Sequence, residues 1–146
     1  NSKGGYNETM DIDQEGLESS LTFVGDKQRL NLTSTFSKSS ESNGKPQLRR
    51  PDEQYGVNYN SKLNSNLIGL FGVNFNYRHV GKAEDWVGSV RKRVDSTDIM
   101  NLSFTKELFG LEWALRSTNL TDEYYQKPYG FNQEGRKFSL SLRSKY

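Results

Sequence analysis

The feature that most constrains this chain is an alternation of apolar and polar residues with a period of two. In residues 136–146, Phe138, Leu140, Leu142 and Tyr146 occupy one set of positions, and charged or small polar residues occupy the other. Because successive side chains of a β-strand point to opposite faces, this pattern predicts a strand with one apolar and one polar face.

The same alternation recurs along the chain and predicts about seven strands of about ten residues each, a length that crosses a bilayer when the strands are tilted. The apolar positions of the further stretches are Leu17, Leu21 and Phe23; Leu30, Leu32 and Phe36; Tyr55, Val57 and Tyr59; Phe71, Val73, Phe75 and Tyr77; Met100, Leu102 and Phe104; and Leu111, Trp113 and Leu115.

The connections between the predicted strands alternate in length. Residues 25–27, 62–66 and 106–110 form short connections, and residues 39–51, 80–94 and 120–135 form long ones. In an antiparallel meander every second connection lies at the same edge, so short turns gather at one edge and long loops at the other. This layout is typical of outer-membrane barrels. We therefore expect an all-β, up-and-down fold without a helix or a domain boundary.

The amino-acid composition indicates which environment each face of such a sheet would meet. Hydrophobic residues make up 32% of the chain and the mean hydropathy is −0.88, values that suggest disorder. The aromatic content of 12% and the periodic apolar residues argue against disorder. The polar positions are rich in Asn, Ser, Thr and Gly, which suits a water-filled interior. Aromatic residues gather near the predicted strand ends, as in the girdles of membrane barrels. They are Tyr55, Tyr77, Trp86, Phe109, Trp113, Tyr124, Tyr125 and Tyr146.

Several function classes find no support in the residues. The net charge of +2 offers no concentrated basic surface for nucleic acid. The chain has no cysteine, and His79 is its one histidine, so a zinc site is not indicated. A serine hydrolase triad could use only His79, and no Gly-x-Ser-x-Gly elbow occurs, so an outer-membrane protease or lipase is only a formal alternative. Glu84, Asp85, Asp95 and Asp98 could bind calcium weakly, but we favour a solvated acidic loop. We predict no enzymatic activity, no cofactor and no metal centre.

The last third of the chain carries the most specific motif. It consists of Asn119, Leu120, Asp122 and Tyr125, then Gly130, Gly135 and Arg136, and a terminal strand ending at Tyr146. In this order the residues resemble the C-terminal signature of TonB-dependent outer-membrane receptors, which commonly end in Phe. Two upstream pieces resemble the family as well, namely Gly16 with Glu18, and Arg50 with Pro51.

The motif has two interpretations. Asn and Asp bond to nearby backbone and favour turns, and glycine permits positive φ. We favour the interpretation that the motif shapes the exit from a strand into a loop; direct contact with a ligand is the alternative.

The resemblance implies that residues 1–146 form the C-terminal segment of a receptor barrel in the outer membrane of a Gram-negative cell. Such barrels have about 22 strands around an N-terminal plug, and no plug or TonB box is recognisable in this chain. The implied function is uptake of an iron-siderophore, cobalamin or a similar scarce nutrient. The implied partners are outer-membrane lipid, the remainder of the barrel with its plug, TonB, and the small-molecule nutrient. Among loop residues, we expect Trp86, Tyr125, Tyr129 and Phe131 to contact the ligand.

Two alternatives remain open. The chain could be a small, self-contained outer-membrane barrel or anchor of about eight strands, with residues 1–10 contributing part of a strand. It could also be a soluble β-sheet binding module, because the strands of a sandwich show the same alternation with the apolar face in a core. The abrupt start at Asn1 favours a piece of a larger barrel.

Overall fold

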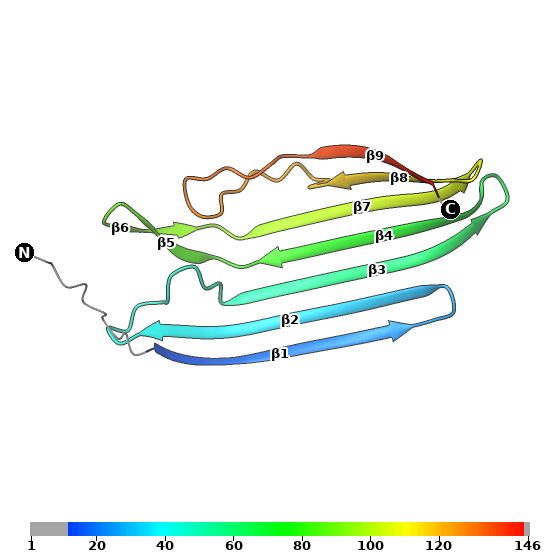
Figure 1. The fold of residues 1–146 in the computed structure, drawn as a ribbon. Coiled ribbons are helices and arrows are strands. Elements are labelled where there is room, and N and C mark those ends of the chain that lie inside the picture. The colour runs from blue at the N-terminus through cyan, green and yellow to red at the C-terminus, as the bar shows by residue number, and fades with distance from the viewer. Residues whose placement is uncertain (1–11, 145–146) are drawn as a thin grey trace, which may run out of the picture.

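The computed structural model describes residues 12–144 and has an all-β fold (Figure 1). The described residues contain no helix that is long and apolar enough to span a membrane. The strands are β1 (Ile12–Val24), β2 (Gln28–Glu41), β3 (Glu53–Ser65), β4 (Gly69–Val80), β5 (Ala83–Val87), β6 (Val90–Val94), β7 (Thr97–Leu108), β8 (Leu111–Thr118) and β9 (Lys137–Ser144).

Seven of these strands form one antiparallel sheet in the order β1-β2-β3-β4-β7-β8-β9. Neighbours in the sheet are neighbours along the chain once the β5–β6 hairpin is set aside. The predicted meander of seven strands is therefore confirmed.

The prediction of a loop over residues 80–94 was incomplete, because this stretch holds the hairpin of β5 and β6. Its strands have five residues each, too few for a period of two to stand out in the sequence. The hairpin has opposite charges in register, with Glu84 opposite Arg93 and Asp85 opposite Lys92. Such cross-strand pairs stabilise a short hairpin, and Gly88 provides the positive φ of 61° at its turn.

Short and long connections lie at opposite ends of the sheet (Figure 1). The short connections between β3 and β4 and between β7 and β8 contain fewer residues than predicted, because β3 continues to Ser65 and β7 to Leu108. Phe109 and Gly110 form the turn after β7, with φ of 55° and 74°. Two positive φ values match a tight hairpin turn to the twist of its strands, which explains how a bulky Phe comes to occupy this conformation beside Gly110.

The strand register places the apolar residues on one face of the sheet, named here the apolar face. Leu21, Leu32, Val57, Tyr77 and Met100 are register partners across β1, β2, β3, β4 and β7. Because a shift of one residue would move a whole strand's apolar set to the other face, this continuous row shows that all five strands share one consistent register.

The opposite side, named here the polar face, has a row of amide side chains one position further along. Thr22, Asn31, Asn58, Asn76 and Asn101 are register partners across the same strands. The side-chain amide of Asn31 donates to Thr22 at 2.8 Å, that of Asn76 to Asn58 at 3.0 Å, and that of Asn101 to Asn76 at 3.1 Å. These hydrogen bonds satisfy part of the polar face within the sheet.

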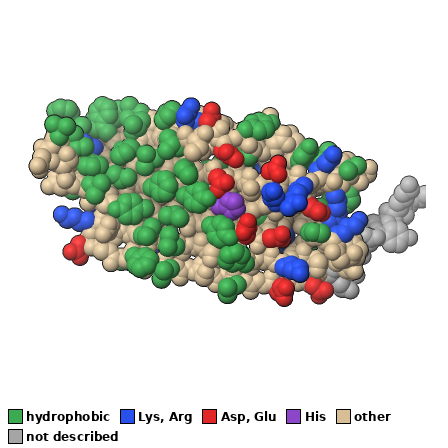
Figure 2. All heavy atoms as spheres, turned by 180° about the vertical axis from the view of Figure 1, so that it is seen from behind, with side chains coloured by type: hydrophobic (Ala, Val, Ile, Leu, Met, Phe, Trp, Pro, Cys, Tyr) green, Lys and Arg blue, Asp and Glu red, His purple; other side chains and the backbone are tan. Residues whose placement is uncertain are grey.

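Among the residues that the structure describes, none covers the apolar face, and the polar face is covered only where the long connections lie over it. Among them the only buried hydrophobic residue is Ala114, whereas Leu17, Phe138 and Leu140 are each more than 60% exposed. Figure 2 shows the apolar face, on which hydrophobic side chains gather toward the short turns and charged ones toward the long connections. The sealed core that a soluble sandwich requires is absent from residues 12–144.

Candidate functional site

The three long connections come together at one end of the sheet (Figure 1). They are residues 42–52 between β2 and β3, residues 81–96 with the β5–β6 hairpin, and residues 119–136 between β8 and β9, and are named here the loop cluster. Residues far apart in the sequence thus become neighbours, and ionic and backbone contacts hold them together.

Asp85 joins three parts of the loop cluster. The residue is 2% exposed, and its carboxylate accepts a hydrogen bond from Arg49 Nε at 2.7 Å. The backbone N–H of Trp86 donates to the same oxygen at 2.8 Å, and that of Tyr129 donates to the other oxygen at 3.0 Å. Asp85 therefore fastens residues 42–52 and 119–136 to the hairpin.

These contacts keep Asp85 ionised. Burial alone would raise its pKa, but the hydrogen bond from Arg49 and the two backbone N–H donors outweigh burial and lower the pKa below its usual value. Hydrogen bonds to a charged group are the stronger kind in proteins. The carboxylate is thus a stable, charged anchor at neutral pH.

Arg91 makes a second set of contacts in the loop cluster. Its guanidinium pairs with the carboxylate of Glu41, and donates to Glu84 at 3.1 Å and to the carbonyl of Pro46 at 2.8 Å. It also lies 5.4 Å from the ring centroid of Trp86, in a cation–π arrangement. The hydrogen bond from Arg91 lowers the pKa of Glu41, so the hairpin is tied to the end of β2 through ionised groups.

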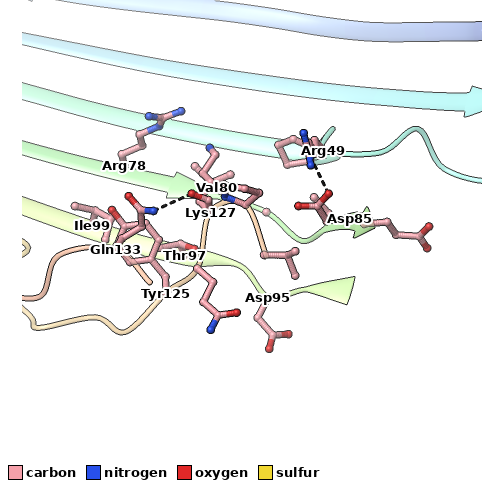
Figure 3. Close-up of a pocket in the computed structure, with 17 residues that line it drawn as sticks. Arg49, Arg78, Val80, Asp85, Asp95, Thr97, Ile99, Tyr125, Lys127 and Gln133 are labelled. Carbon is pink, nitrogen blue, oxygen red and sulfur yellow. Dashed lines mark hydrogen bonds and ion pairs between the residues drawn. The ribbon is translucent and has the colours of Figure 1, made fainter. Parts of the chain in front are cut away.

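A cavity of about 380 Å³ lies between the loop cluster and the polar face of the sheet (Figure 3). The sheet contributes Arg78, Val80, Thr97 and Ile99 to its lining, and the loop cluster contributes the remainder. The further lining residues are Arg49, Pro51, Gly81, Ala83, Glu84, Asp85, Val94, Asp95, Tyr125, Gln126, Lys127, Pro128 and Gln133.

The lining of this cavity combines apolar surface with charge. Glu84 and Asp85 are paired with Arg91 and Arg49, respectively. Beyond these pairs, Arg78 and Lys127 add two positive side chains and Asp95 adds one negative side chain. A mostly apolar pocket with a few convergent polar groups is typical of small-molecule binding. With Arg49 counted, the lining holds three basic and three acidic side chains, so its formal charges balance, and Arg78 and Lys127 are the cations outside the printed ion pairs that could donate to oxygen atoms of a ligand.

The predicted ligand-contact residues lie in different parts of the loop cluster. Tyr125 lines the cavity. Trp86 lies against Arg91, and Tyr129 is engaged with Asp85 through its backbone N–H. Phe131 is 67% exposed and does not line the cavity. The structure therefore brings one of the four to the cavity and leaves the other three around it.

The motif residues Asn119 and Asp122 bind the two ends of the 119–136 connection to each other. Asn119 is 4% exposed; its side chain donates to the carbonyls of Glu123 at 2.8 Å and Glu134 at 3.3 Å, and accepts from the N–H of Glu123 at 2.8 Å. Asp122 accepts from the N–H of Arg136 at 2.7 Å. A Cβ at Gly135 would lie 2.9 Å from this Asp122 oxygen. All of these contacts are with backbone groups of the same connection. They agree with the interpretation that the motif shapes the exit from a strand into a loop.

The remaining motif residues are spread over the chain. Leu120 donates its N–H to the carbonyl of Met100 at 2.8 Å, and Gly130 has a φ of 85°. Gly16 and Glu18 lie in β1, far in sequence from the loop cluster, and Arg50 and Pro51 lie within it; only Pro51 of these four lines the cavity. Tyr146 lies outside the described residues.

Sequence reasoning missed the residues that organise the cavity. The expectation of a solvated acidic loop was wrong for Asp85, which is buried against Arg49. No group of three or more metal-binding side chains occurs within residues 12–144. The one usable signal was the pairing of charged residues in the 80–94 stretch, but it does not reveal contacts with residues 42–52.

The apolar face ends in polar residues on the side of the long connections. His79 Nδ1 lies 2.8 Å from a carboxylate oxygen of Asp98, and the hydroxyl of Tyr77 donates to the same oxygen at 2.6 Å. The hydroxyl of Tyr55 donates to Glu53 at 2.8 Å. This row separates the hydrophobic part of the face from the loop cluster.

Comparison with solved structures reveals similar folds in outer-membrane receptors. The ferripyoverdine receptor of the outer membrane of Pseudomonas aeruginosa, bound to ferripyoverdine, superposes with a TM-score of 0.79 at 15% identity. P. aeruginosa FpvA bound to heterologous pyoverdines matches with 0.79 at 16%, and the FpvAI–pyocin S2 complex with 0.77 at 16%. Each match covers 91% of this chain and 19% of the receptor chain, so this chain spans about a fifth of their length.

These likenesses concern the fold. No protein-family model matches the sequence. No curated protein matches it either.

Proposed function

We propose that this chain is the C-terminal segment of the β-barrel of a TonB-dependent transporter in the outer membrane of a Gram-negative cell. In this proposal residues 1–146 contribute barrel wall and three extracellular loops. The short turns face the periplasm, and the loop cluster faces the outside.

The observation that carries the proposal is the uncovered apolar face, bounded by polar groups at both ends. Along β7, Asp98 marks one end and Lys106 the other, eight residues apart on the same face. At about 3.4 Å per residue this is about 27 Å along the strand, and a tilt of about 40° leaves about 21 Å across the membrane. Apolar bands of outer-membrane barrels are about 25 Å tall, so the height is appropriate for a bilayer.

The cavity of the loop cluster supports a role in ligand capture. It opens over the polar face, which in a barrel faces the aqueous interior, and it offers Arg78 and Lys127 beside Tyr125. We propose that the ligand is a ferric siderophore, in keeping with the receptors of similar fold, one of which is described as bound to ferripyoverdine. Nothing in the comparisons supports cobalamin.

The rest of the transporter belongs to parts of the protein that this chain does not contain. A barrel needs further strands to pair with the open edges β1 and β9. We propose that those parts also include the plug and the segment that contacts TonB. On this view the chain itself takes no part in catalysis.

The test uses the whole protein in its native host. Membrane fractionation should place it in the outer membrane, and the detergent-extracted protein should change its gel migration on heating. Uptake of a radiolabelled ferric siderophore should require TonB. A protein that stays in buffer without detergent would contradict the proposal.

The cavity is tested with matched variants. Arg78→Gln should reduce siderophore affinity by about tenfold, the effect of losing one charge-assisted hydrogen bond. Arg116→Gln removes a charge from the same polar face outside the cavity lining and should leave affinity unchanged. Equal effects of both variants would mean that the cavity does not bind the ligand.

A further inference from the structure

A second hollow lies on the polar face, at the end of the sheet that carries the short turns. It has a volume of about 490 Å³ and lies among residues 25–27 and strands β2, β3, β4 and β7. A Cβ at Gly72 would overlap the hydroxyl oxygen of Thr105, so glycine at this position keeps the floor of the hollow free of a side chain. Two rows of register partners cross the hollow, Arg29 with Asn60, Asn74 and Ser103, and Lys62 with Gly72 and Thr105.

Three cations gather around this hollow. Lys27, Arg29 and Lys62 line it, and all three are exposed. The N–H of Lys62 donates to the carbonyl of Lys27 at 2.7 Å, and Arg29 lies opposite Asn60, two residues before Lys62 on the same face. Asp26 is the one acidic residue among those that line the hollow. With three basic residues against one acidic residue, the hollow has a formal excess of two positive charges.

These cations lack acidic partners within residues 12–144. None of the three forms an ion pair there, whereas Arg49, Arg91 and Lys137, at the opposite end of the sheet, each pair with a carboxylate. Like charges that lie close together repel one another, and a carboxylate placed among them removes that repulsion. Charge complementarity therefore favours an acidic partner at the end of the short turns.

We infer that this hollow, named here the basic hollow, is the docking site of an acidic segment of the same protein that lies outside residues 1–146. The Asp or Glu carboxylates of the segment accept hydrogen bonds from Lys27, Arg29 and Lys62. The neutral amides and hydroxyls beside these cations can hydrogen-bond with the backbone of the segment. The inference rests on the proposed function, because the polar face meets the rest of the protein only when it lines the interior of a closed barrel.

The size of the hollow and the length of proteins with a similar fold both favour this occupant. A water molecule takes up about 30 Å³ of liquid volume. A hollow of about 490 Å³ is therefore far larger than a single small anion and accommodates a turn of several residues. This chain covers 19% of each receptor chain of similar fold, so most of such a protein lies beyond the matching segment. That remainder can reach the interior of the barrel.

Zero-length crosslinking of the whole protein in a mild detergent tests this inference. A water-soluble carbodiimide joins a lysine amine to a carboxylate where the two are in contact, and mass spectrometry identifies the joined peptides. Lys27 and Lys62 should be joined to Asp or Glu residues of one segment outside residues 1–146. Lys137, whose ammonium lies 3.4 Å from a carboxylate oxygen of Glu134, is the positive control.

Three crosslinking results would overturn the inference. In the first, Lys27 and Lys62 are joined only to carboxylates within residues 1–146, such as Asp26. In the second, they are joined to another protein. In the third, they form no crosslink in a sample in which Lys137 is joined to Glu134.

Variants show whether the charges hold the segment in place. Lys62→Glu replaces an attraction with a repulsion, so the amide hydrogens of the crosslinked segment should exchange at least about fivefold faster, the effect of losing one charge-assisted hydrogen bond. Lys62→Arg keeps the charge and should preserve the protection from exchange. Lys137→Glu changes a cation of the same face outside the basic hollow and should leave the exchange unchanged. Exchange at the wild-type rate in Lys62→Glu would overturn the inference.

The two proposals fail in different ways. If the wild-type protein shows heat-modifiable migration and outer-membrane location but Lys27 and Lys62 are not joined to such a segment, the docking site is wrong and the proposed function stands. If the wild-type protein is never found in a membrane, the proposed function fails and the docking site fails with it.

Discussion

The guanidinium of Arg49 lies 2.7 Å from a carboxylate oxygen of Asp85, although the two residues are 36 positions apart in the chain. Arg49 has a positive φ of 60° and its side chain is 67% exposed, whereas that of Asp85 is 3% exposed. The buried partner is therefore the organising one, because it also accepts the N–H groups of Trp86 and Tyr129.

Asp85→Asn should loosen the loop cluster while leaving the sheet intact. The amide lacks the charge that strengthens three hydrogen bonds, so the amides of Trp86 and Tyr129 should exchange with solvent at least about tenfold faster, equivalent to about 1.4 kcal/mol. Hydrogen exchange with mass spectrometry measures this. Asp95→Asn, in the same cavity lining, is the control and should leave these amides protected from exchange. Equally fast exchange in both variants would show that Asp85 has no special role in holding the loop cluster together.

The loop cluster should also open in acid. The pKa of Asp85 is lowered in the folded protein, so its contribution to stability is fully present above the unfolded Asp pKa of about 3.9 and is lost as pH falls through the folded value. No change is expected between pH 7 and 5. Fluorescence of Trp86, with other tryptophans replaced, should change only below about pH 4. The Asp85→Asn variant should lack this transition, and a transition near pH 6 would point to a different group.

Asn119 should be sensitive to substitution for two separable reasons. It adopts a positive φ of 49° and its buried side chain makes three hydrogen bonds with backbone. Asn119→Ala should destabilise the protein by about 2 to 3 kcal/mol, measured as a shift of the urea unfolding midpoint in detergent. Asn119→Gly tolerates the φ but lacks the side chain, so it should recover about 1 kcal/mol of this loss. Full recovery by Gly would mean that the hydrogen bonds contribute nothing.

The assignment of the two faces is tested by neighbouring residues at the middle of β7. Leu102 lies on the apolar face and Ser103 on the polar face. Leu102→Arg should destabilise the inserted protein by about 2 to 4 kcal/mol, the effect of arginine at a bilayer midplane, whereas Ser103→Arg should have little effect. Urea titration of protein folded into vesicles measures both. A larger destabilisation by Ser103→Arg than by Leu102→Arg would mean that the polar face, and not the apolar face, meets the lipid.

Residues 1–146 on their own should not form a stable monomer in buffer. Both β1 and β9 are edge strands with unpaired backbone groups, and the apolar face has no cover among the described residues. Size-exclusion chromatography should show aggregates. A monomer with a cooperative melting transition in plain buffer would contradict both this prediction and the proposed function.

The sequence alone determined the seven strands of the large sheet, their order and which of their residues share a face, but not the β5–β6 hairpin. Each of these follows from local rules: side chains alternate along a strand, and short connections join antiparallel neighbours. The alternation of Phe71, Val73 and Phe75 is readable without knowing any contact. Boundaries were less accurate because Ser65 and Leu108 extend their strands by pairing with Gly69 and Leu111.

Only the tertiary structure decided the cavity and the burial of Asp85. In the sequence Asp85 looks like any other acidic residue of a loop. In the structure it is bound by Arg49 and Tyr129, which belong to two other connections. In the sequence Lys106 is only a residue close to a predicted turn. In the structure it lies opposite Trp113 on the neighbouring strand and donates to the carbonyl of Ile68. Burial and pairing depend on which distant segments meet, and a local pattern of residue types does not encode that meeting.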